Sequence, residues 1–270
     1  MNFADKAPVI LSLSLHDPSG GSGIQADIET ANSLGCHCTS VITLLCSQDT
    51  RELKSAVPVN TPMLIEQVRA ILEDMPIAAI KIGCPGSTEN IEAIHSILRD
   101  YPDIPVVLDP GTRLLEDIQA DNSDTMAAIR ALLLPQVTLL SANIHEAYDL
   151  AQQADTLDAC AQELLETGCG YVLINGSKRS QKHYDSVLYD ANGIVRSYSR
   201  EWLNILSRGH GTTLSASLTC YLAHGLSVTD AAEQAQSFTW KALANHHRPG
   251  MGKQFLNRFF WADKNKKSAQ

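Results

Sequence analysis

Hydrophobic and polar positions alternate along the chain between two repeating patterns. Short aliphatic and β-branched runs predict buried strands at residues 9–15, 39–45, 78–82, 106–109, 137–140 and 171–174. Between these runs, apolar residues recur at helical spacing, which predicts helices at residues 23–34, 61–73, 88–99, 125–133 and 157–167. This alternation predicts an α/β fold whose mostly parallel sheet carries helices on both faces.

The pattern changes after residue 174. Two β-rich runs at residues 184–189 and 194–198 flank an Asp-Ala-Asn-Gly segment, whose Asn-Gly pair favours a hairpin turn. Long helical patterns follow at residues 212–224 and 228–246. The sequence contains no Pro- or Ser-rich linker and no internal repeat. We therefore expect a single domain over residues 1–270, with residues 264–270 as a frayed tail.

Two glycine-rich stretches lie at the start of predicted helices. Residues 17–27 read DPSGGSGIQAD and directly follow the first predicted strand, and residues 209–216 read GHGTTLSA near the C-terminus. Unpaired backbone N–H groups and the helix dipole favour an anion at a helix N-terminus. The two stretches therefore predict the halves of one phosphate-handling site, although glycine can also serve backbone freedom alone.

Composition excludes several classes of protein. The net charge of −9 argues against nucleic-acid binding, and no apolar run reaches the roughly 18 residues of a membrane span. The seven cysteines include no C-x-x-C pair, so neither a disulfide framework nor a zinc site is indicated. We expect a cytoplasmic protein with reduced cysteines and with neither nucleic acid nor membrane as a partner.

Residues 17–27 resemble the hydroxymethylpyrimidine/phosphomethylpyrimidine kinases of thiamine biosynthesis, which belong to the ribokinase-like superfamily. The usual form in this family is DPSGGAGIQAD, so only Ser22 differs. Further matches follow in order through Val41-Ile42-Thr43, Gln48-Asp49-Thr50, Lys81-Ile82-Gly83, Val107-Leu108-Asp109-Pro110, Asn143-Ile144-His145-Glu146-Ala147, GHGTTLSA and Gly250-Met251-Gly252. The resemblance covers nearly the whole chain. It implies a ribokinase-like three-layer sandwich, ATP and Mg²⁺ as cofactors, a small pyrimidine substrate and a homodimer.

The resemblance implies roles at the phosphate end of the site. The residues concerned are Gly209, His210, Gly211 and Thr212 for catalysis and the anion hole, Asn143 and Asn175 with Gly209 and Gly211 for nucleotide or phosphate, and Asp109 and Glu146 for the metal. Carboxylates with retained waters are the usual protein ligands of Mg²⁺. Asn143 can instead be an N-cap, with Glu146 completing a capping box, and the two roles are compatible.

Six residues are implied at the pyrimidine end, namely Ser22, Asp27, Cys46, Gln48, Cys84 and Gly111. The amide of Gln48 can both donate and accept, which suits a ring nitrogen beside an exocyclic amine. Cys46, Cys84 and Gly111 stand where the family often has larger apolar residues. We therefore expect a reshaped acceptor pocket.

Two departures from the family pattern concern catalysis. The family's G-T-G-C places a cysteine as the proposed base where this chain has Thr212, and losing a general base costs about 10²–10⁴ in rate. Asn175 replaces a lysine that would neutralise phosphate charge. His210 is the neighbour whose unperturbed pKa lies near neutrality, so it is a candidate replacement base. Arg113, Lys178 and Arg179 could supply positive charge, or be ordinary surface residues.

The sequence thus predicts ATP-dependent phosphorylation of hydroxymethylpyrimidine or its phosphate, with turnover impaired by the loss of the cysteine. Two alternatives remain open. One is a degenerate paralogue that binds a pyrimidine or a nucleotide without catalysis. The other is an activity like that of pyridoxal kinase.

Overall fold

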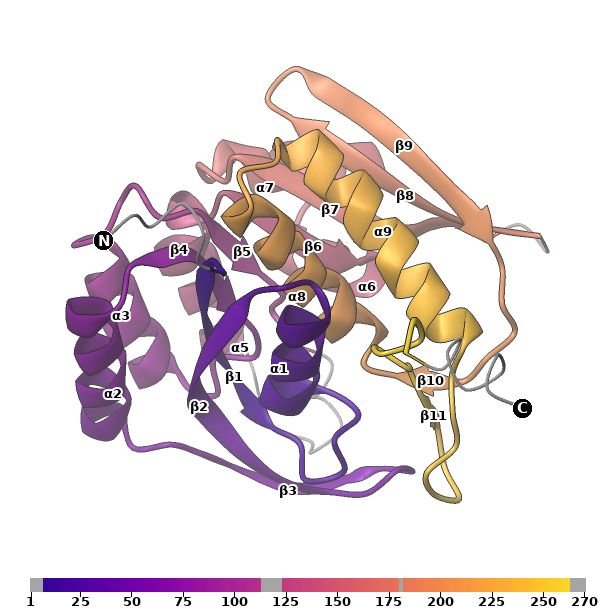
Figure 1. Cartoon of the computed structure of the whole chain (residues 1–270). Helices are drawn as coiled ribbons and strands as arrows, with labels where there is room; N and C mark the ends of the chain where they lie inside the picture. The colour runs from indigo at the N-terminus through magenta and orange to yellow at the C-terminus, as the bar shows by residue number, and fades with distance from the viewer. Residues whose placement is uncertain (1–6, 113–122, 180–181, 263–270) are drawn as a thin grey trace.

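The computed structural model describes residues 7–112, 123–179 and 182–262, with a nine-stranded sheet at the centre (Figure 1). In spatial order the strands are β3 (Leu53–Pro58), β2 (His37–Gln48), β1 (Val9–His16), β4 (Ile77–Ile82), β5 (Val106–Leu108), β6 (Leu139–Asn143), β7 (Tyr171–Arg179), β8 (His183–Asp190) and β9 (Gly193–Glu201). Pairing is parallel from β2 through β7 and antiparallel at both edges. A separate parallel pair joins β10 (Ser207–Arg208) to β11 (Gln254–Phe255). The predicted mostly parallel sheet is confirmed.

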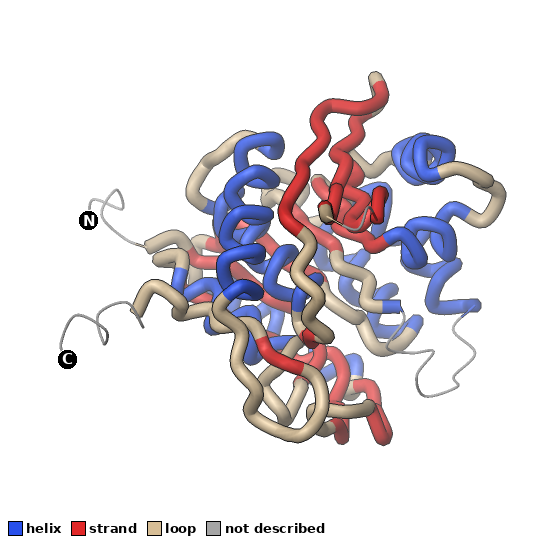
Figure 2. The backbone as a smooth tube through the Cα atoms, turned by 90° about the vertical axis from the view of Figure 1, so that its right-hand side faces the viewer, coloured by secondary structure: helices blue, strands red, loops and turns tan. Residues whose placement is uncertain are grey.

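Helices cover both faces of the sheet (Figures 1 and 2). One layer contains α2 (Thr61–Asp74), α3 (Thr88–Leu98), α5 (Ser123–Ala128), α6 (Ile144–Ala151) and α7 (Leu157–Glu166). The other layer contains α1 (Gly23–Ser33), α8 (His210–Ala223) and α9 (Val228–Ala244). Successive side chains of a strand point to opposite faces, so Val106 and Leu108 pack in the first layer and Val107 packs in the second, with Leu214 of α8. The three-layer arrangement is confirmed.

Most predicted elements are present, and the exceptions have physical causes. Strand β3 was not predicted because, apart from Leu53, its side chains are not buried, which leaves no hydrophobic alternation to detect. The helix predicted over residues 125–133 is α5 followed by a π-helical turn, Ile129–Leu133, and a short 3₁₀ segment, Leu134–Gln136. Helix α6 also escaped prediction, although its Asn143 N-cap was recognised.

The strand ends position the candidate site. Asp17 follows β1, Asp109 follows β5, and Asn143 is the last residue of β6. Because these strands are parallel, their carboxyl ends meet along one edge of the sheet, where ligands of open α/β folds bind. In the part of the chain that the structure describes, no helix is both long and apolar enough to cross a membrane.

Candidate active site

The loop between β1 and α1 is organised by the carboxylate of Asp17, which is fully buried. Its two oxygens accept hydrogen bonds from the backbone N–H and the hydroxyl of Ser19, at 2.8 and 2.6 Å, and from those of Ser22, at 2.9 and 2.8 Å. The hydroxyl of Ser22 therefore faces Asp17 and does not cap α1, although Ser22 is its N-cap residue. These four hydrogen bonds are local, because both donors lie within five positions of Asp17.

The N-terminus of α8 has no side-chain cap, because its N-cap residue is Gly209, with a φ of +86°. The first hydrogen bond inside the helix runs from the N–H of Thr213 to the carbonyl of Gly209, at 2.9 Å. The preceding N–H groups of His210, Gly211 and Thr212 are those that an α-helix leaves without intrahelical partners. This terminus is therefore suited to an anion.

The structure brings the two glycine-rich stretches into direct contact. A Cβ atom at Gly209 would overlap the carbonyl oxygen of Gly21, so only glycine allows this approach. Arg258, which is 2% exposed, joins the same elements from the C-terminal segment. Its guanidinium donates to the hydroxyl of Thr213 at 3.0 Å, to the carbonyl of Gly21 at 2.8 Å and to Glu29 of α1 at 2.9 Å. Arg258 was not recognised in the sequence.

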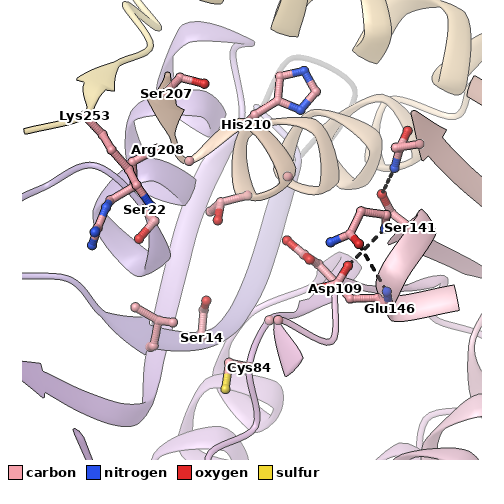
Figure 3. A pocket seen from close by; sticks show the side chains of 18 of the residues that line it. Ser14, Ser22, Cys84, Asp109, Ser141, Glu146, Ser207, Arg208, His210 and Lys253 are labelled. Atoms are coloured by element: carbon pink, nitrogen blue, oxygen red, sulfur yellow. Dashed lines mark hydrogen bonds between the residues drawn. The ribbon is translucent and has the colours of Figure 1, made fainter. Parts of the chain in front are cut away.

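A cavity of about 450 Å³ lies where these elements meet (Figure 3). Its lining includes most of the residues implied by the sequence, namely Ser22, Cys84, Asp109, Gly111, Asn143, Glu146, Asn175, Gly209, His210, Gly211 and Thr212. Burial raises the pKa of Cys84, which lines this cavity, to about 12, so its thiol stays neutral. Gly111 lies against Cys84, where a Cβ would stand 3.2 Å from the cysteine Cβ.

One wall of the cavity is acidic. Asp109 accepts a hydrogen bond from the hydroxyl of Ser215 at 2.9 Å, and burial raises its pKa while Lys81 acts in the opposite direction. Glu146, which is 5% exposed, accepts from the backbone N–H of Asn143 at 3.0 Å. The capping box is therefore formed, while Asn143 and Glu146 still line the cavity. Two carboxylates on one wall are a donor set that Mg²⁺ accepts when waters and phosphate oxygens complete its shell.

His210 and Asn175 are both engaged by protein groups. The His210 ring packs edge-on against the Tyr184 ring, with 5.5 Å between centroids, and Figure 3 shows it turned away from Asp109. Desolvation lowers the pKa of His210 to about 4, so the ring is neutral at pH 7 and accepts a proton poorly. Asn175 donates to the hydroxyl of Ser141 at 3.2 Å and accepts from Gln236 at 3.3 Å.

Asp27, although predicted to bind substrate, is not on the cavity wall. It is fully buried, and its carboxylate lies 2.6 Å from Nζ of Lys81 and accepts from the hydroxyl of Ser12 at 2.6 Å. Cys46 does not line the cavity either, and burial raises its pKa to about 11. The structure thus gives Asp27 a charge partner in the core.

Opposite the acidic wall lie two cationic side chains, Arg208 and Lys253, which sequence reasoning missed (Figure 3). Gln48 lies behind this wall, where its Oε1 accepts from Nη1 of Arg208 at 2.5 Å. The only sequence signal for Arg208 was its position directly before Gly209. Of the other cations considered, Arg113 lies outside the described residues.

Comparison with models of known protein families identifies the family of this chain. Residues 17–257 match the family model described as phosphomethylpyrimidine kinase. The chain belongs to the phosphomethylpyrimidine kinase family. The resemblance found in the sequence is therefore confirmed.

Individual relatives extend over almost the whole chain. The hydroxymethylpyrimidine/phosphomethylpyrimidine kinase of Escherichia coli K12 is 32% identical over 239 residues, which cover 87% of this chain and 90% of that protein. The kinase of the same name from Bacillus subtilis 168 is 28% identical, covering 92% and 94%. The crystal structure of phosphomethylpyrimidine kinase from Clostridium difficile 630 is 27% identical and superposes with a TM-score of 0.73, covering 87% of this chain and 100% of that one.

Pyridoxal kinases share the fold. The enzyme from Staphylococcus aureus in complex with AMP-PCP superposes with a TM-score of 0.84 at 23% identity, and covers 93% of each chain. The ribokinase-like architecture expected from the sequence is thus confirmed in this phosphomethylpyrimidine kinase family member. The roles of the individual site residues remain predictions.

A second, smaller cavity of about 170 Å³ adjoins the first. Tyr184, Ser207 and His210 line both cavities. The rest of the smaller lining is largely apolar and aromatic, and includes Trp202, Leu203, Ile205, Trp240 and Leu243. A flat apolar group could occupy this space while a connected charged group reached the helix terminus at Gly209.

Proposed function

We propose that this chain transfers the γ-phosphoryl group of ATP to hydroxymethylpyrimidine or to its phosphate, in thiamine biosynthesis. One observation carries the proposal. The uncapped N-terminus of α8 lies in the same cavity as the carboxylates of Asp109 and Glu146. Phosphoryl transfer depends on positioning and on charge stabilisation. The helix terminus would contact the phosphate anion, and the two carboxylates would contact a metal cation.

The donor side of the reaction has two parts. Backbone N–H groups of His210, Gly211 and Thr212 would hold the transferring phosphoryl group, with Asn143 and Asn175 beside it. Asp109 and Glu146 would hold Mg²⁺, which neutralises phosphate charge when bound. The aromatic cavity around Trp202 and Trp240 would take the adenine ring, because stacking on indole suits a flat heteroaromatic base.

The acceptor side lies across the cavity, where Cys84 and Gly111 form an apolar floor and Ser22 lies on the wall. Gln48 would orient the ring indirectly, because its Oε1 is already bonded to Arg208. We propose that a single domain carries all of these groups and that the protein is cytoplasmic. We also propose that it is a homodimer, which light scattering on the purified chain would test.

The test is a coupled assay of ADP release with Mg-ATP and, separately, hydroxymethylpyrimidine, its monophosphate and pyridoxal. We expect release with at least one pyrimidine and little with pyridoxal. Faster release with pyridoxal would overturn the pyrimidine assignment. Release with none of the three would overturn the enzyme assignment, and thermal stabilisation by Mg-ATP would then support a nucleotide-binding paralogue.

A further inference from the structure

Two cysteines that are far apart in the sequence lie together at the amino end of the sheet. Cys36 directly precedes β2 and is 4% exposed, and Cys220, in the last turn of α8, is fully buried. Both belong to one small hydrophobic cluster, and Sγ of Cys36 lies 3.9 Å from the carbonyl oxygen of Cys220. The cavity lies at the carboxyl ends of the parallel strands, so this pair is separate from the site of the proposed kinase reaction.

The ring of His224 lies beside Cys36 in an orientation that favours a thiolate. Its Nε2 is 3.4 Å from Sγ of Cys36 and 2.9 Å from the carbonyl oxygen of Leu34. A carbonyl oxygen can only accept a hydrogen bond, so Nε2 carries a hydrogen in this contact. The same N–H therefore faces the sulfur as a donor, and a donor stabilises the charged form of an acid. His224 is itself exposed, which places Cys36 directly beneath the surface.

Cys36 differs from the other cysteines in its ionisation. All seven cysteines lie in the described residues, and only Cys36 has a pKa below the ordinary value of 9.0. A hydrogen bond from the Cys220 thiol is the main cause, burial acts in the opposite direction, and His224 lowers the pKa further. The same hydrogen bond, with burial, raises the pKa of Cys220. The thiolate is the reactive form of cysteine, so Cys36 is the nucleophile of the pair and Cys220 keeps its proton.

We propose that Cys36 and Cys220 form a reversible disulfide when the protein meets a peroxide, with Cys36 as the attacking sulfur and His224 as the group that stabilises its thiolate. Thiols that share a hydrogen bond belong to side chains that point toward one another, which a disulfide requires. In a reducing compartment the pair rests as two thiols, in agreement with the reduced cysteines expected from the sequence.

The reaction has two steps. The thiolate of Cys36 attacks one oxygen of the peroxide, the O–O bond breaks, and the other oxygen leaves as hydroxide, which takes up the proton that the thiol has released. Cys36 is then a sulfenic acid. The sulfur of Cys220 attacks it, an S–S bond forms, and the S–O bond breaks. The departing hydroxide takes the thiol proton of Cys220. Two thiols thus give up two electrons, and hydrogen peroxide becomes two waters.

The first experiment identifies the bond in the unsubstituted protein. The reduced full chain is treated with hydrogen peroxide, the remaining thiols are blocked with iodoacetamide, and the peptides are mapped by mass spectrometry without reductant. We expect a linked peptide pair that joins Cys36 to Cys220 and weighs two hydrogen atoms less than the two free peptides. Dithiothreitol should separate the pair. Absence of this link, at peroxide levels that oxidise any cysteine of the chain, overturns the proposal.

Cysteine variants test which sulfur reacts first. Cys220→Ala should leave Cys36 as a sulfenic acid, which dimedone labels, whereas Cys36→Ala should abolish the link without labelling of Cys220. Cys38→Ala is the matched control, because Cys38 is two positions from Cys36 and more exposed, yet burial raises its pKa to about 12. This variant should form the link as the wild type does. Dimedone on Cys38 in place of Cys36 would show that exposure decides the reaction, and would overturn the proposal.

Alkylation rates test the part played by His224. In the wild type at pH 7, iodoacetamide should modify Cys36 at least about tenfold faster than Cys38. His224→Leu should slow the reaction at Cys36 by about tenfold, the effect of losing a hydrogen bond to a charged group. His37→Leu, at the exposed residue next to Cys36 in the sequence, is the control and should leave the rate unchanged. An unchanged rate in His224→Leu would overturn the role of this ring, and faster modification of Cys38 in the wild type would overturn the choice of Cys36.

Discussion

The two glycine-rich loops of the site are held in place by different kinds of contact. In the loop of residues 17–23, Asp17 accepts four hydrogen bonds from Ser19 and Ser22, all within five positions of itself. The turn at Gly209 has no side-chain cap and is fixed by distant groups. The carbonyl of Gly21 packs against Gly209, and Arg258 binds both Gly21 and Thr213.

This difference separates a locally specified loop from one that depends on the rest of the protein. Four local hydrogen bonds constrain residues 17–23, and Arg258 adds one from a distant segment, to the carbonyl of Gly21. The turn at Gly209 needs three segments to be assembled before its N–H groups are aimed at the cavity. The four predictions below test this contrast, in order of decreasing effect.

The largest effect is expected from alanine at one positive-φ glycine in each loop, Gly209 at +86° and Gly20 at +79°. Gly209→Ala should lower the free energy of unfolding by about 3–5 kcal/mol, since left-handed strain and overpacking against Gly21 add. Gly20→Ala should lower it by only about 1–2 kcal/mol, because its Cβ would meet open space. Urea unfolding measures both. Equal losses of unfolding free energy in the two variants would contradict the difference between the two loops.

A cysteine at position 212, in the loop that contains Gly209, should restore a general base. Thr212→Cys is expected to raise kcat for the alcohol acceptor by about 10²-fold, the lower end of the contribution of a general base. Steady-state ADP release measures the gain. Thr212→Ser is the control, because a serine hydroxyl supplies no base and should give no increase. An unchanged rate in Thr212→Cys would show that the base is not what limits alcohol transfer.

Removal of the guanidinium that joins the loops should have a smaller effect. Arg258→Met is expected to lower the free energy of unfolding by about 2 kcal/mol, as charged hydrogen bonds to Gly21 and Thr213 are lost. Hydrogen exchange should increase more at residues 209–213 than at residues 17–23. Arg51→Met, at an exposed residue, should change stability by less than about 0.5 kcal/mol. A larger increase in exchange at residues 17–23 than at residues 209–213 would show that the first loop, not the turn at Gly209, depends on Arg258.

The effect that is smallest at neutral pH concerns the dependence of stability on pH. Burial holds the pKa of His210 at about 4, below its ordinary value of 6.5, so the folded state favours the neutral ring. The stability that this ring contributes is therefore present above pH 6.5 and is lost as pH falls toward 4. His210→Gln should reduce the slope of the unfolding free energy against pH in this window. The reduction should correspond to at most about one fewer proton taken up on unfolding. His37→Gln, at an exposed residue, is the control and should leave the slope unchanged.

Much of the fold followed from hydrophobic periodicity. Strands β1, β4, β5 and β7 and helices α1, α2, α3 and α7 correspond to predicted elements, because buried strands and amphipathic helices carry their own pattern. Strand β3 did not, since it pairs at an exposed edge through backbone groups that sequence does not distinguish. The π-helical turn at Ile129–Leu133 likewise depends on packing against neighbours.

The candidate site divides in the same way. Gly209, Asp109 and Glu146 were recognisable because motifs place them directly at strand and helix ends. Asp27 looked like a ligand residue within a near-identical motif, yet it is buried against Lys81, 54 positions away. No spacing rule connects those two residues. The buried pair follows from the neighbouring positions of β1, β4 and α1 in the folded sheet.

The sequence by itself determined the α/β alternation, the family and the threonine at position 212, because each is written in contiguous residues. It also predicted two anion-binding helix termini. Only the tertiary structure decided which charged side chains surround the cavity. Arg258 reaches Gly21 across 237 positions, and Arg208 reaches Gln48 across 160. Chain topology brings such residues together, and burial strengthens the interaction of each charge with its partner. Neither effect leaves a pattern in the neighbouring residues of the sequence.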